Sequence, residues 1–258
     1  MNGAFHIAAI GLDAQQRALD TIANNISNIN TPAFKRSGVR FSEILASRPD
    51  PAMVRADLGE SLVTLAGVRS DQLFMLDEQG RLEATGQPLD LAIDGAGFIE
   101  LMGPDGQTLL WRGGTLRIGD DGLLASTAGL PLKAAVTVPV DATAIRIGAD
   151  GIVRAEAGEA AAEAVEIGQI MLVRIQNPET IERLDGGLYR VTEETRLADA
   201  RPGEDGAGQL VQGSIERSTV ELTSEMVQLM LVQRAYAANA QVVQAADQLM
   251  ALANGLRR

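Results

Sequence analysis

The sequence predicts an α+β protein with long N- and C-terminal helices, packed as a coiled-coil-like pair, and a central, mostly β domain. Three observations predict this class. Apolar residues recur at helical spacing near both ends, and Gly and Pro are absent from residues 216–254. In the middle, tight Asp-Gly turns separate short apolar runs.

The chain divides into four segments by composition. Residues 1–45 are expected to form an N-terminal helix and turn, and residues 46–80 an extended linker containing Pro49 and Pro51. Residues 81–205 are expected to form the β-rich domain, and residues 206–258 the C-terminal assembly helix. Residues 201–208, which are rich in Gly, Asp and Pro, are expected to form a linker to the C-terminal helix.

The C-terminal helix, predicted over about residues 220–254, carries two apolar seams. The first consists of Leu222, Met226, Leu229, Tyr236, Ala240, Val243 and Met250, and is interrupted by Gln233 and Asp247. The second consists of Leu231, Ala235, Ala238, Val242, Ala245, Leu249, Leu252 and Leu256. A single partner helix can bury one seam, so we expect the other to contact other molecules. A core helix of a bundle is the alternative.

The N-terminal helix is predicted from Ala4 to about Asn28. Its apolar face consists of Ile7, Ile10, Ala14, Ala18, Ile22, Ile26 and Ile29. Pro32 ends the helical pattern, because proline disfavours helix in the residue before it. Lys35 and Arg36 then predict a basic patch, and residues 41–45 a short helix or strand.

The middle of the chain has β character. Residues 91–101 predict a strand, a tight glycine turn and a second strand, and Trp111 is expected in the β core. Residues 167–176 and 188–191 predict further strands, and residues 156–166 a loop or one helical turn. Residues 118–124 echo residues 147–153, which indicates recurring hairpin chemistry rather than a solenoid.

Composition excludes several classes of function. The chain has 258 residues, no cysteine and a formal net charge of −12, which argues against nucleic acid and anionic lipid as partners. Residues 1–45 carry +1 and residues 216–258 carry no net charge, so the middle carries −13. No apolar run is long enough for a membrane span, and the N-terminus lacks the pattern of a cleaved signal peptide. Export, if it occurs, is expected by another route.

Chemical signals in the sequence are weak. His6 is the one histidine, and no metal-ligand set surrounds it. Most Asp side chains stand in Asp-Gly turns, where they stabilise the turn. We therefore expect no catalytic residue, no metal and no cofactor. An exported cell-wall-acting enzyme and a soluble binding module with a helical stalk are the alternatives from other classes.

Three motifs, in the right order along the chain, are similar to those of the bacterial flagellar basal-body rod and hook protein family. They lie in residues 23–36, in residues 88–98, and in residues 232–239 with 246–250. The motif residues singled out are Asn24, Asn25, Asn28, Phe34, Asp94, Gly95, Gly97, Phe98, Gln233 and Arg234. Within the family, the chain most resembles distal-rod members, with a proximal-rod or hook-type assignment left open. It departs from the pattern in residues 46–85 and at Ala33, where the family usually has glycine.

The resemblance implies a structural subunit that self-assembles into a hollow helical drive shaft. The shaft transmits torque to the hook and passes exported subunits. It also implies terminal helices packed against each other and against neighbouring copies, with the β domain outside. The implied partners are copies of this chain, other rod and hook proteins and the flagellar type III export apparatus. The implied location is the basal body where it crosses the periplasm.

Overall fold

The computed structural model describes residues 2–43, 68–76, 78–157, 164–177, 180–204 and 206–255. At the outer ends of the terminal helices, in residues 40–43 and in residues 68–74, the backbone alone is described. The chain forms two compact units. Unit 1 contains residues 1–26, 37–73 and 221–258, and unit 2 contains residues 27–36 and 74–220.

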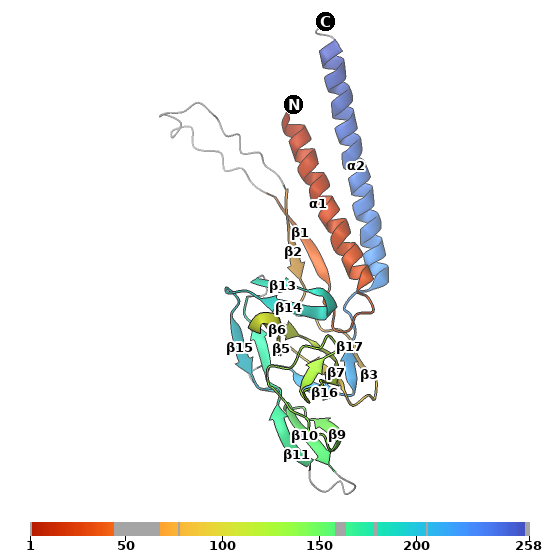
Figure 1. Ribbon diagram of the computed structural model, residues 1–258. Helices are drawn as coiled ribbons and strands as arrows, with labels where there is room; N and C mark the ends of the chain where they lie inside the picture. Colours follow the sequence, from red (N-terminus) through yellow and green to blue (C-terminus); the bar gives the residue numbers. More distant parts are fainter. Residues whose placement is uncertain are drawn as a thin grey trace, which may run out of the picture. The chain divides into compact units, whose positions relative to one another are not determined.

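Unit 1 consists of the two terminal helices and a two-stranded ribbon (Figure 1). Helix α1 (Asn2–Ser27) and helix α2 (Leu222–Gly255) lie side by side and run in opposite directions. The ribbon consists of β1 (Ser37–Glu43) and β2 (Val68–Phe74). The long helices predicted at both ends are confirmed, within about two residues at each boundary, and Phe41 lies in a strand. No helix among the described residues is long and apolar enough to cross a membrane.

Unit 2 is built from antiparallel sheets. The six-stranded sheet has the order β13-β14-β6-β5-β12-β15, and the four-stranded sheet β16-β4-β7-β8. A three-stranded sheet has the order β11-β10-β9, and β17 pairs with β3. The strands are β3 (Leu82–Ala84), β4 (Asp90–Asp94), β5 (Phe98–Met102), β6 (Thr108–Trp111), β7 (Gly113–Ile118), β8 (Leu124–Ser126), β9 (Ala142–Ile147), β10 (Ile152–Ala157), β11 (Ala164–Gln169), β12 (Leu172–Ile175), β13 (Ile181–Arg183), β14 (Leu188–Val191), β15 (Leu197–Ala200), β16 (Gln209–Gln212) and β17 (Ser214–Glu216). The α+β class is thereby confirmed.

The main core of unit 2 is formed by aliphatic side chains from the facing strands, and Trp111 lies in it as expected. A second, smaller cluster surrounds Tyr189, whose ring meets Phe98 edge to face with ring centroids 5.5 Å apart. Such an aromatic pair contributes about 1 kcal/mol beyond the area that it buries. Both clusters are made by strands far apart in the sequence.

The echo between residues 118–124 and 147–153 is a repeated turn. In each copy, an Asp carboxylate accepts a hydrogen bond from the amide two residues later: Asp121 from Leu123 and Asp150 from Ile152, both at 3.1 Å. The Gly at the end of each turn has a positive φ, 79° at Gly122 and 81° at Gly151. Recurring hairpin chemistry is therefore the right explanation of the repeat.

The strand predicted over residues 167–176 is wrong as one element. It forms the end of β11 and all of β12, which belong to different sheets, with Ile170 and Met171 between them. The sequence shows one apolar run because Ile167 packs against the edge of the core while Ile170 and Leu172 are buried in it. The chain changes sheets at Ile170, whose amide donates to the Gly151 carbonyl at 2.8 Å. Most of the predicted linker, residues 44–67, and the centre of the predicted loop, residues 158–163, lie outside the described residues.

Candidate assembly surface

Helix α1 buries a narrow face of small and β-branched residues within unit 1. Ala14, Ala18 and Ile22, all predicted for this face, are at most 5% exposed, and Ile10 is half-buried. Thr21 also lies on this face and donates its hydroxyl hydrogen to the Arg17 carbonyl at 2.9 Å. Small side chains permit a close approach of the neighbouring helix. The side chain of Ile7 lies outside the described residues.

Asn25 connects three parts of unit 1. Its amide nitrogen donates to the Ser37 carbonyl at 2.8 Å and to the Glu225 carboxylate at 3.2 Å. Its amide oxygen accepts from the Ser37 backbone N–H at 3.0 Å. Asn25 and Glu225 are completely buried, so these bonds join the end of α1 to β1 and to the first turn of α2.

Helices α1 and α2 form an antiparallel pair with a constant register. Asn25 meets Glu225, and a Cβ added to Gly11 would lie 3.2 Å from the Asn239 side-chain nitrogen. The residue numbers of both contacts add to 250, as an antiparallel pair of constant register requires. This register places Ala18 level with Val232.

Helix α2 has one half-buried face and a broad exposed apolar surface. Leu229, Val232, Asn239, Ala240 and Val243 are half-buried, at the spacing of one helix face. Seven large apolar side chains are 39–59% exposed, and they are Leu222, Met226, Val227, Met230, Leu231, Tyr236 and Val242.

The two predicted seams differ in exposure. Of the first seam, Leu229, Ala240 and Val243 are half-buried, whereas Leu222, Met226 and Tyr236 are exposed. Of the second seam, Leu231, Ala235, Ala238, Val242 and Ala245 are all exposed. The side chains of Leu249 and Met250 lie outside the described residues. Exposed Gln233 and Arg234 stand among these apolar residues. Within one chain, the second seam has no partner among the described residues.

A buried ion cluster lies inside unit 2. One oxygen of the Glu216 carboxylate accepts from the Lys35 ammonium at 2.5 Å and from the Gly80 amide at 2.7 Å. The other accepts from Arg112 Nε at 3.1 Å, and Lys35 also donates to the Glu78 carbonyl at 2.5 Å. Lys35, Arg112 and Glu216 are at most 3% exposed. The predicted basic patch is therefore wrong for Lys35, because its charge is turned into the protein to meet Glu216.

The cluster holds two cations against one carboxylate in a buried place. Burial lowers the pKa of Lys35 below its ordinary value of 10.5, and Arg112 acts in the same direction, while Glu216 opposes them. The lowered pKa means that the protonated ammonium is retained at a cost in folding free energy.

The turn after α1 is anchored within unit 2. Phe34 is buried, and the Arg183 guanidinium lies 4.4 Å from the centroid of its ring. Arg183 also donates to the Lys35 carbonyl. The Ala33 amide donates to Glu216 and the Thr219 amide to Phe34, at 2.8 and 3.0 Å. These bonds connect the segment that follows α1 to the segment that precedes α2.

The motif asparagines differ in their surroundings. Asn28 accepts the Thr31 hydroxyl hydrogen at 3.1 Å, and its carbonyl accepts the Thr31 amide at the same distance, which closes the turn after α1. Asn24 is exposed, in contrast to buried Asn25. Asp94 is exposed as well and accepts from the Gln79 side chain at 3.0 Å.

The central glycine motif lies where the chain passes between two sheets. Strand β4 belongs to the four-stranded sheet and β5 to the six-stranded one, so residues 95–97 are a crossing rather than a hairpin turn. Gly95 and Gly97 have φ of 113° and 134°, and a Cβ on Gly95 would lie 2.7 Å from Gly208 Cα. Both the backbone conformation and this close approach require glycine at position 95.

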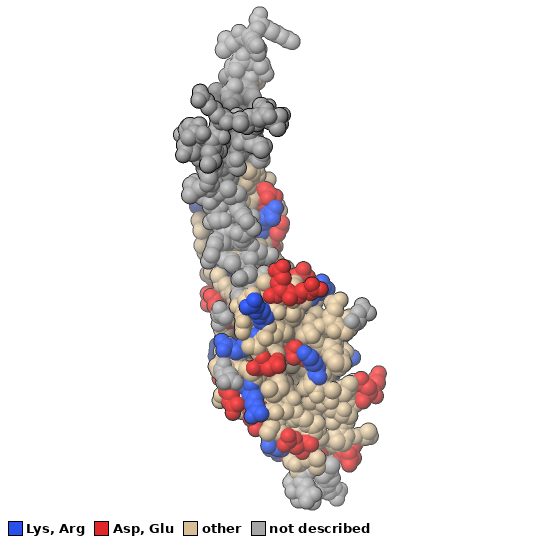
Figure 2. Space-filling view, turned by 90° about the vertical axis from the view of Figure 1, so that its left-hand side faces the viewer, with Lys and Arg blue, Asp and Glu red and all other residues tan. Residues whose placement is uncertain are grey.

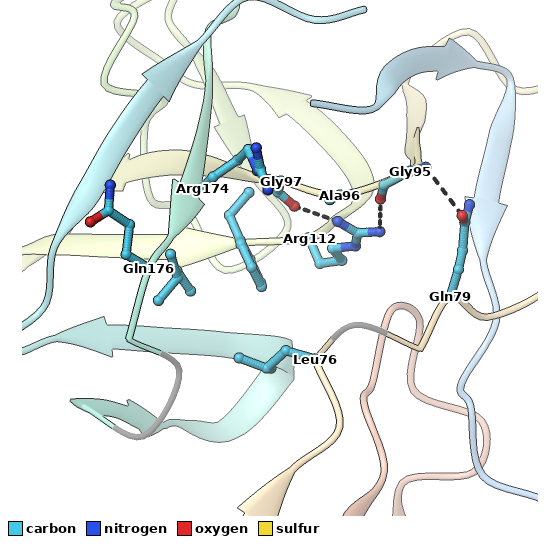
Figure 3. A pocket seen from close by; sticks show the side chains of 10 residues that line it. Leu76, Gln79, Gly95, Ala96, Gly97, Arg112, Arg174 and Gln176 are labelled. Atoms are coloured by element: carbon cyan, nitrogen blue, oxygen red, sulfur yellow. Dashed lines mark hydrogen bonds between the residues drawn. The ribbon is translucent and has the colours of Figure 1, made fainter. Parts of the chain in front are cut away.

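Two other crossings between the same sheets meet the glycine motif. Arg112 stands between β6 and β7, and its guanidinium donates to the carbonyls of Gly95 and Gly97 (Figure 3). Residues 201–208 connect β15 to β16, and the Gly208 amide donates to the Ala96 carbonyl at 2.7 Å. One short motif thus joins three crossings.

A cavity of about 490 Å³ lies beside the motif. Its walls include Leu76, Phe98 and Ile175, and the Gln79 side chain lies toward Gly95, as Figure 3 shows. The oxygen of Gln79 accepts the Gly95 amide hydrogen at 3.1 Å. Arg112, which also lines the cavity, is already bonded to Glu216 and to two carbonyls. The polar groups of Gln79 and Arg112 therefore stabilise residues 95–97.

Among the described residues, no group of His, Asp and Glu side chains is arranged to hold a metal ion.

Sequence reasoning missed Lys35, Arg112 and Glu216 as buried, connecting residues, and Arg183 as a half-buried one. Glu216 and Lys35 are 181 positions apart, and no local period relates them. Arg112 directly follows Trp111, which was expected in the core. This neighbour was the sequence signal from which the burial of Arg112 could have been predicted.

Three family models match the chain. They are the flagella basal body rod protein model at residues 5–35, the flagellar hook protein FlgE/F/G D1 domain at residues 92–155, and the flagellar basal body rod FlgEFG protein C-terminal model at residues 211–256. Together they cover most of both helices and part of the strands between them.

Curated relatives match over nearly the whole chain. The flagellar basal-body rod protein FlgG of Caulobacter vibrioides is 33% identical, covering 98% of this chain and 99% of the relative. FlgG of Borreliella burgdorferi is 32% identical over the full length of both chains. The flagellar basal-body rod protein FlgF of Caulobacter vibrioides is 31% identical, over 88% of this chain and 87% of the relative. The resemblance predicted from the three motifs is confirmed, and this chain belongs to the flagellar basal-body rod FlgEFG family, as a structural subunit of the rod and not an enzyme.

Proposed function

We propose that this chain is a distal-rod subunit that polymerises with copies of itself into a hollow helical shaft. Residues 1–45 and the C-terminal helix form the assembly core, and the β-rich unit faces outward. The shaft transmits torque to the hook and passes exported subunits. The subunit reaches its place, where the basal body crosses the periplasm, through the flagellar export apparatus.

The exposed apolar surface of α2 carries this proposal. Seven large apolar side chains, each 39–59% exposed, lie on a helix whose opposite face is already used by α1. Completing their burial would contribute roughly 1 kcal/mol per side chain, from about 1.5–3 kcal/mol for a fully buried one. An apolar surface of this kind marks an interaction site.

Relatives named FlgG that span nearly the whole chain support the distal assignment. A proximal-rod or hook-type subunit is the second candidate, favoured by the FlgF relative and by the match to the hook protein D1 domain. Family membership implies assembly with rod and hook components in either case.

Leu231→Asp tests the assembly surface. Leu231 is 59% exposed, so the substitution should leave the subunit folded, whereas an uncompensated carboxylate at a subunit interface should prevent polymerisation. Electron microscopy of the purified protein under polymerising conditions should show hollow rods for the wild type and none for Leu231→Asp. Val140→Asp is the matched control, since Val140 is fully exposed in unit 2 and should still form rods. Normal rods from Leu231→Asp would exclude α2 as the assembly surface.

A further inference from the structure

Arg234 is isolated among apolar residues. It is the one charged residue in residues 226–246, and its side chain is exposed on α2. Its neighbours one turn away on the same helix are Met230, Leu231, Ala237 and Ala238, none of which can compensate a charge. In the part of the chain that the structure describes, Arg234 takes part in no hydrogen bond or ion pair. A guanidinium at the centre of an apolar surface has to meet an anion when that surface is covered.

The outward side of α1 carries one carboxylate more than it has cations. Asp13 is paired with Arg17 at 3.0 Å. Asp20 accepts a hydrogen bond from the neutral Gln16 amide at 3.1 Å, and it has no cationic partner among the described residues. Its side chain is exposed. Asp20 is therefore a carboxylate on the helix pair that makes no ion pair with a described residue, since Arg17, three positions before it, is paired with Asp13.

The other acidic side chains at the helix pair are already stabilised. Glu225 is buried and accepts a hydrogen bond from Asn25. Glu221 directly precedes α2, where the free N–H groups at the helix N-terminus favour a negative charge. Among the described helix side chains, Asp20 and Arg234 remain as the complementary charges.

Asp20 and Arg234 do not meet within one copy. The helix register places Asp20 level with position 230, about 6 Å along the axis from Arg234 at about 1.5 Å per residue. Both side chains are described and exposed, and no ion pair joins them. A partner for Arg234 has to come from another molecule that presents a carboxylate beside an apolar helix, which is what α1 of a second copy presents.

We infer that Arg234 of one copy binds Asp20 on α1 of a second copy. This inference rests on the proposed polymerisation and adds the contact that sets how neighbouring copies are aligned. The apolar surface of α2 supplies attraction with little positional preference, whereas an arginine–carboxylate pair has directional hydrogen bonds and so selects one axial alignment.

Charge reversal tests the pairing in the full-length protein. Arg234→Glu and Asp20→Arg should each raise the protein concentration needed for rod formation at least tenfold, because like charges then face each other. The double variant, Arg234→Glu with Asp20→Arg, should return that concentration to within about threefold of wild type. Asp13→Arg combined with Arg234→Glu is the matched control and should not restore assembly. Asp13 is two helical turns from Asp20 on the same face, and it is already paired with Arg17.

The outcomes separate this inference from the proposed function. Wild-type protein that forms no rods overturns the proposed function. Wild-type rods together with normal assembly of Arg234→Glu overturn the pairing alone. The pairing is also overturned if the double variant stays defective while circular dichroism shows intact helices, or if Asp13→Arg restores assembly as well as Asp20→Arg does.

Discussion

Ala33 adopts a backbone conformation that L-residues avoid. Its φ is 56°, and it is 2% exposed. The family usually has glycine here, and the positive φ explains that preference. Alanine at this position carries a strain of about 1–2 kcal/mol, which is partly offset because its buried methyl group adds roughly 0.8 kcal/mol and its unfolded chain is less flexible than that of glycine.

This balance predicts a small effect for one substitution of Ala33 and a large loss of stability for another. Ala33→Gly should change the free energy of unfolding of unit 2 by less than about 1 kcal/mol, because relief of strain offsets the lost methyl and the added flexibility. Ala33→Val should lower it by more than about 2 kcal/mol, because a β-branched residue is poorly tolerated at positive φ. Urea unfolding followed by Trp111 fluorescence measures both. Equal stability of the two variants would exclude strain at this position.

Lys35 makes the stability of unit 2 depend on pH in an unusual direction. Its folded-state pKa is lowered by burial, so between that pKa and the ordinary value of 10.5 the unfolded state binds more protons than the folded state. Stability therefore rises as the pH rises through this window. Below it, the full cost of burying the protonated ammonium is present. Glu216, Arg112 and Glu78 are the charged residues that act on Lys35.

We expect the wild type to gain unfolding free energy relative to Lys35→Met as the pH rises toward the ordinary lysine pKa of 10.5, by up to about 1.4 kcal/mol per pH unit within the window. Trp111 fluorescence in urea at each pH provides the measurement. The variant is the control for every other group that titrates in this range. Parallel pH profiles of the two proteins would show that Lys35 does not titrate differently in the folded state.

Among the elements, α1 depends on Asn25 for its attachment to α2 and β1. Asn25→Ala removes three hydrogen bonds, which reach the buried Glu225 carboxylate and both backbone groups of Ser37. We expect a loss of about 2–4 kcal/mol in the stability of the helix pair, and a lower melting temperature of the helical circular dichroism signal.

Asn24→Ala is the control for this change. Asn24 is exposed at the adjacent position of the same helix, so its replacement should cost less than that of the buried Asn25. If the two variants melt at the same temperature, the buried amide of Asn25 does not hold the elements together.

Local elements could be predicted from the sequence because their signals are local. The periodicity of Ala14, Ala18 and Ile22 predicted both α1 and its buried face, and the Asp-Gly turns predicted the repeated hairpin chemistry. The strand boundary near Ile170 was predicted wrongly, because an apolar run does not show where a chain changes from one sheet to another.

The whole molecule depends on contacts that no short pattern predicts. The Glu216 carboxylate accepts hydrogen bonds from Lys35, Gly80 and Arg112, which belong to three segments far apart in the sequence. A lone Glu before a helix looks the same in sequence whether it is solvated or buried. The assembly surface could be anticipated in part, because α2 has more apolar positions than one neighbouring helix can cover. Which of those positions α1 uses depends on the register.

The three chain crossings at residues 95–97 bear on how unit 2 responds to twisting. Two sheets that touch through side chains alone can slide, because dispersion contacts re-form after a small displacement. Here peptide groups and the Arg112 guanidinium connect the sheets through short, directional bonds at one place. A shearing displacement between the two sheets would therefore be resisted both by the covalent chain that crosses between them and by these hydrogen bonds. We therefore expect unit 2 to respond to twisting as a stiff body, as the proposed role in a torque-transmitting shaft requires.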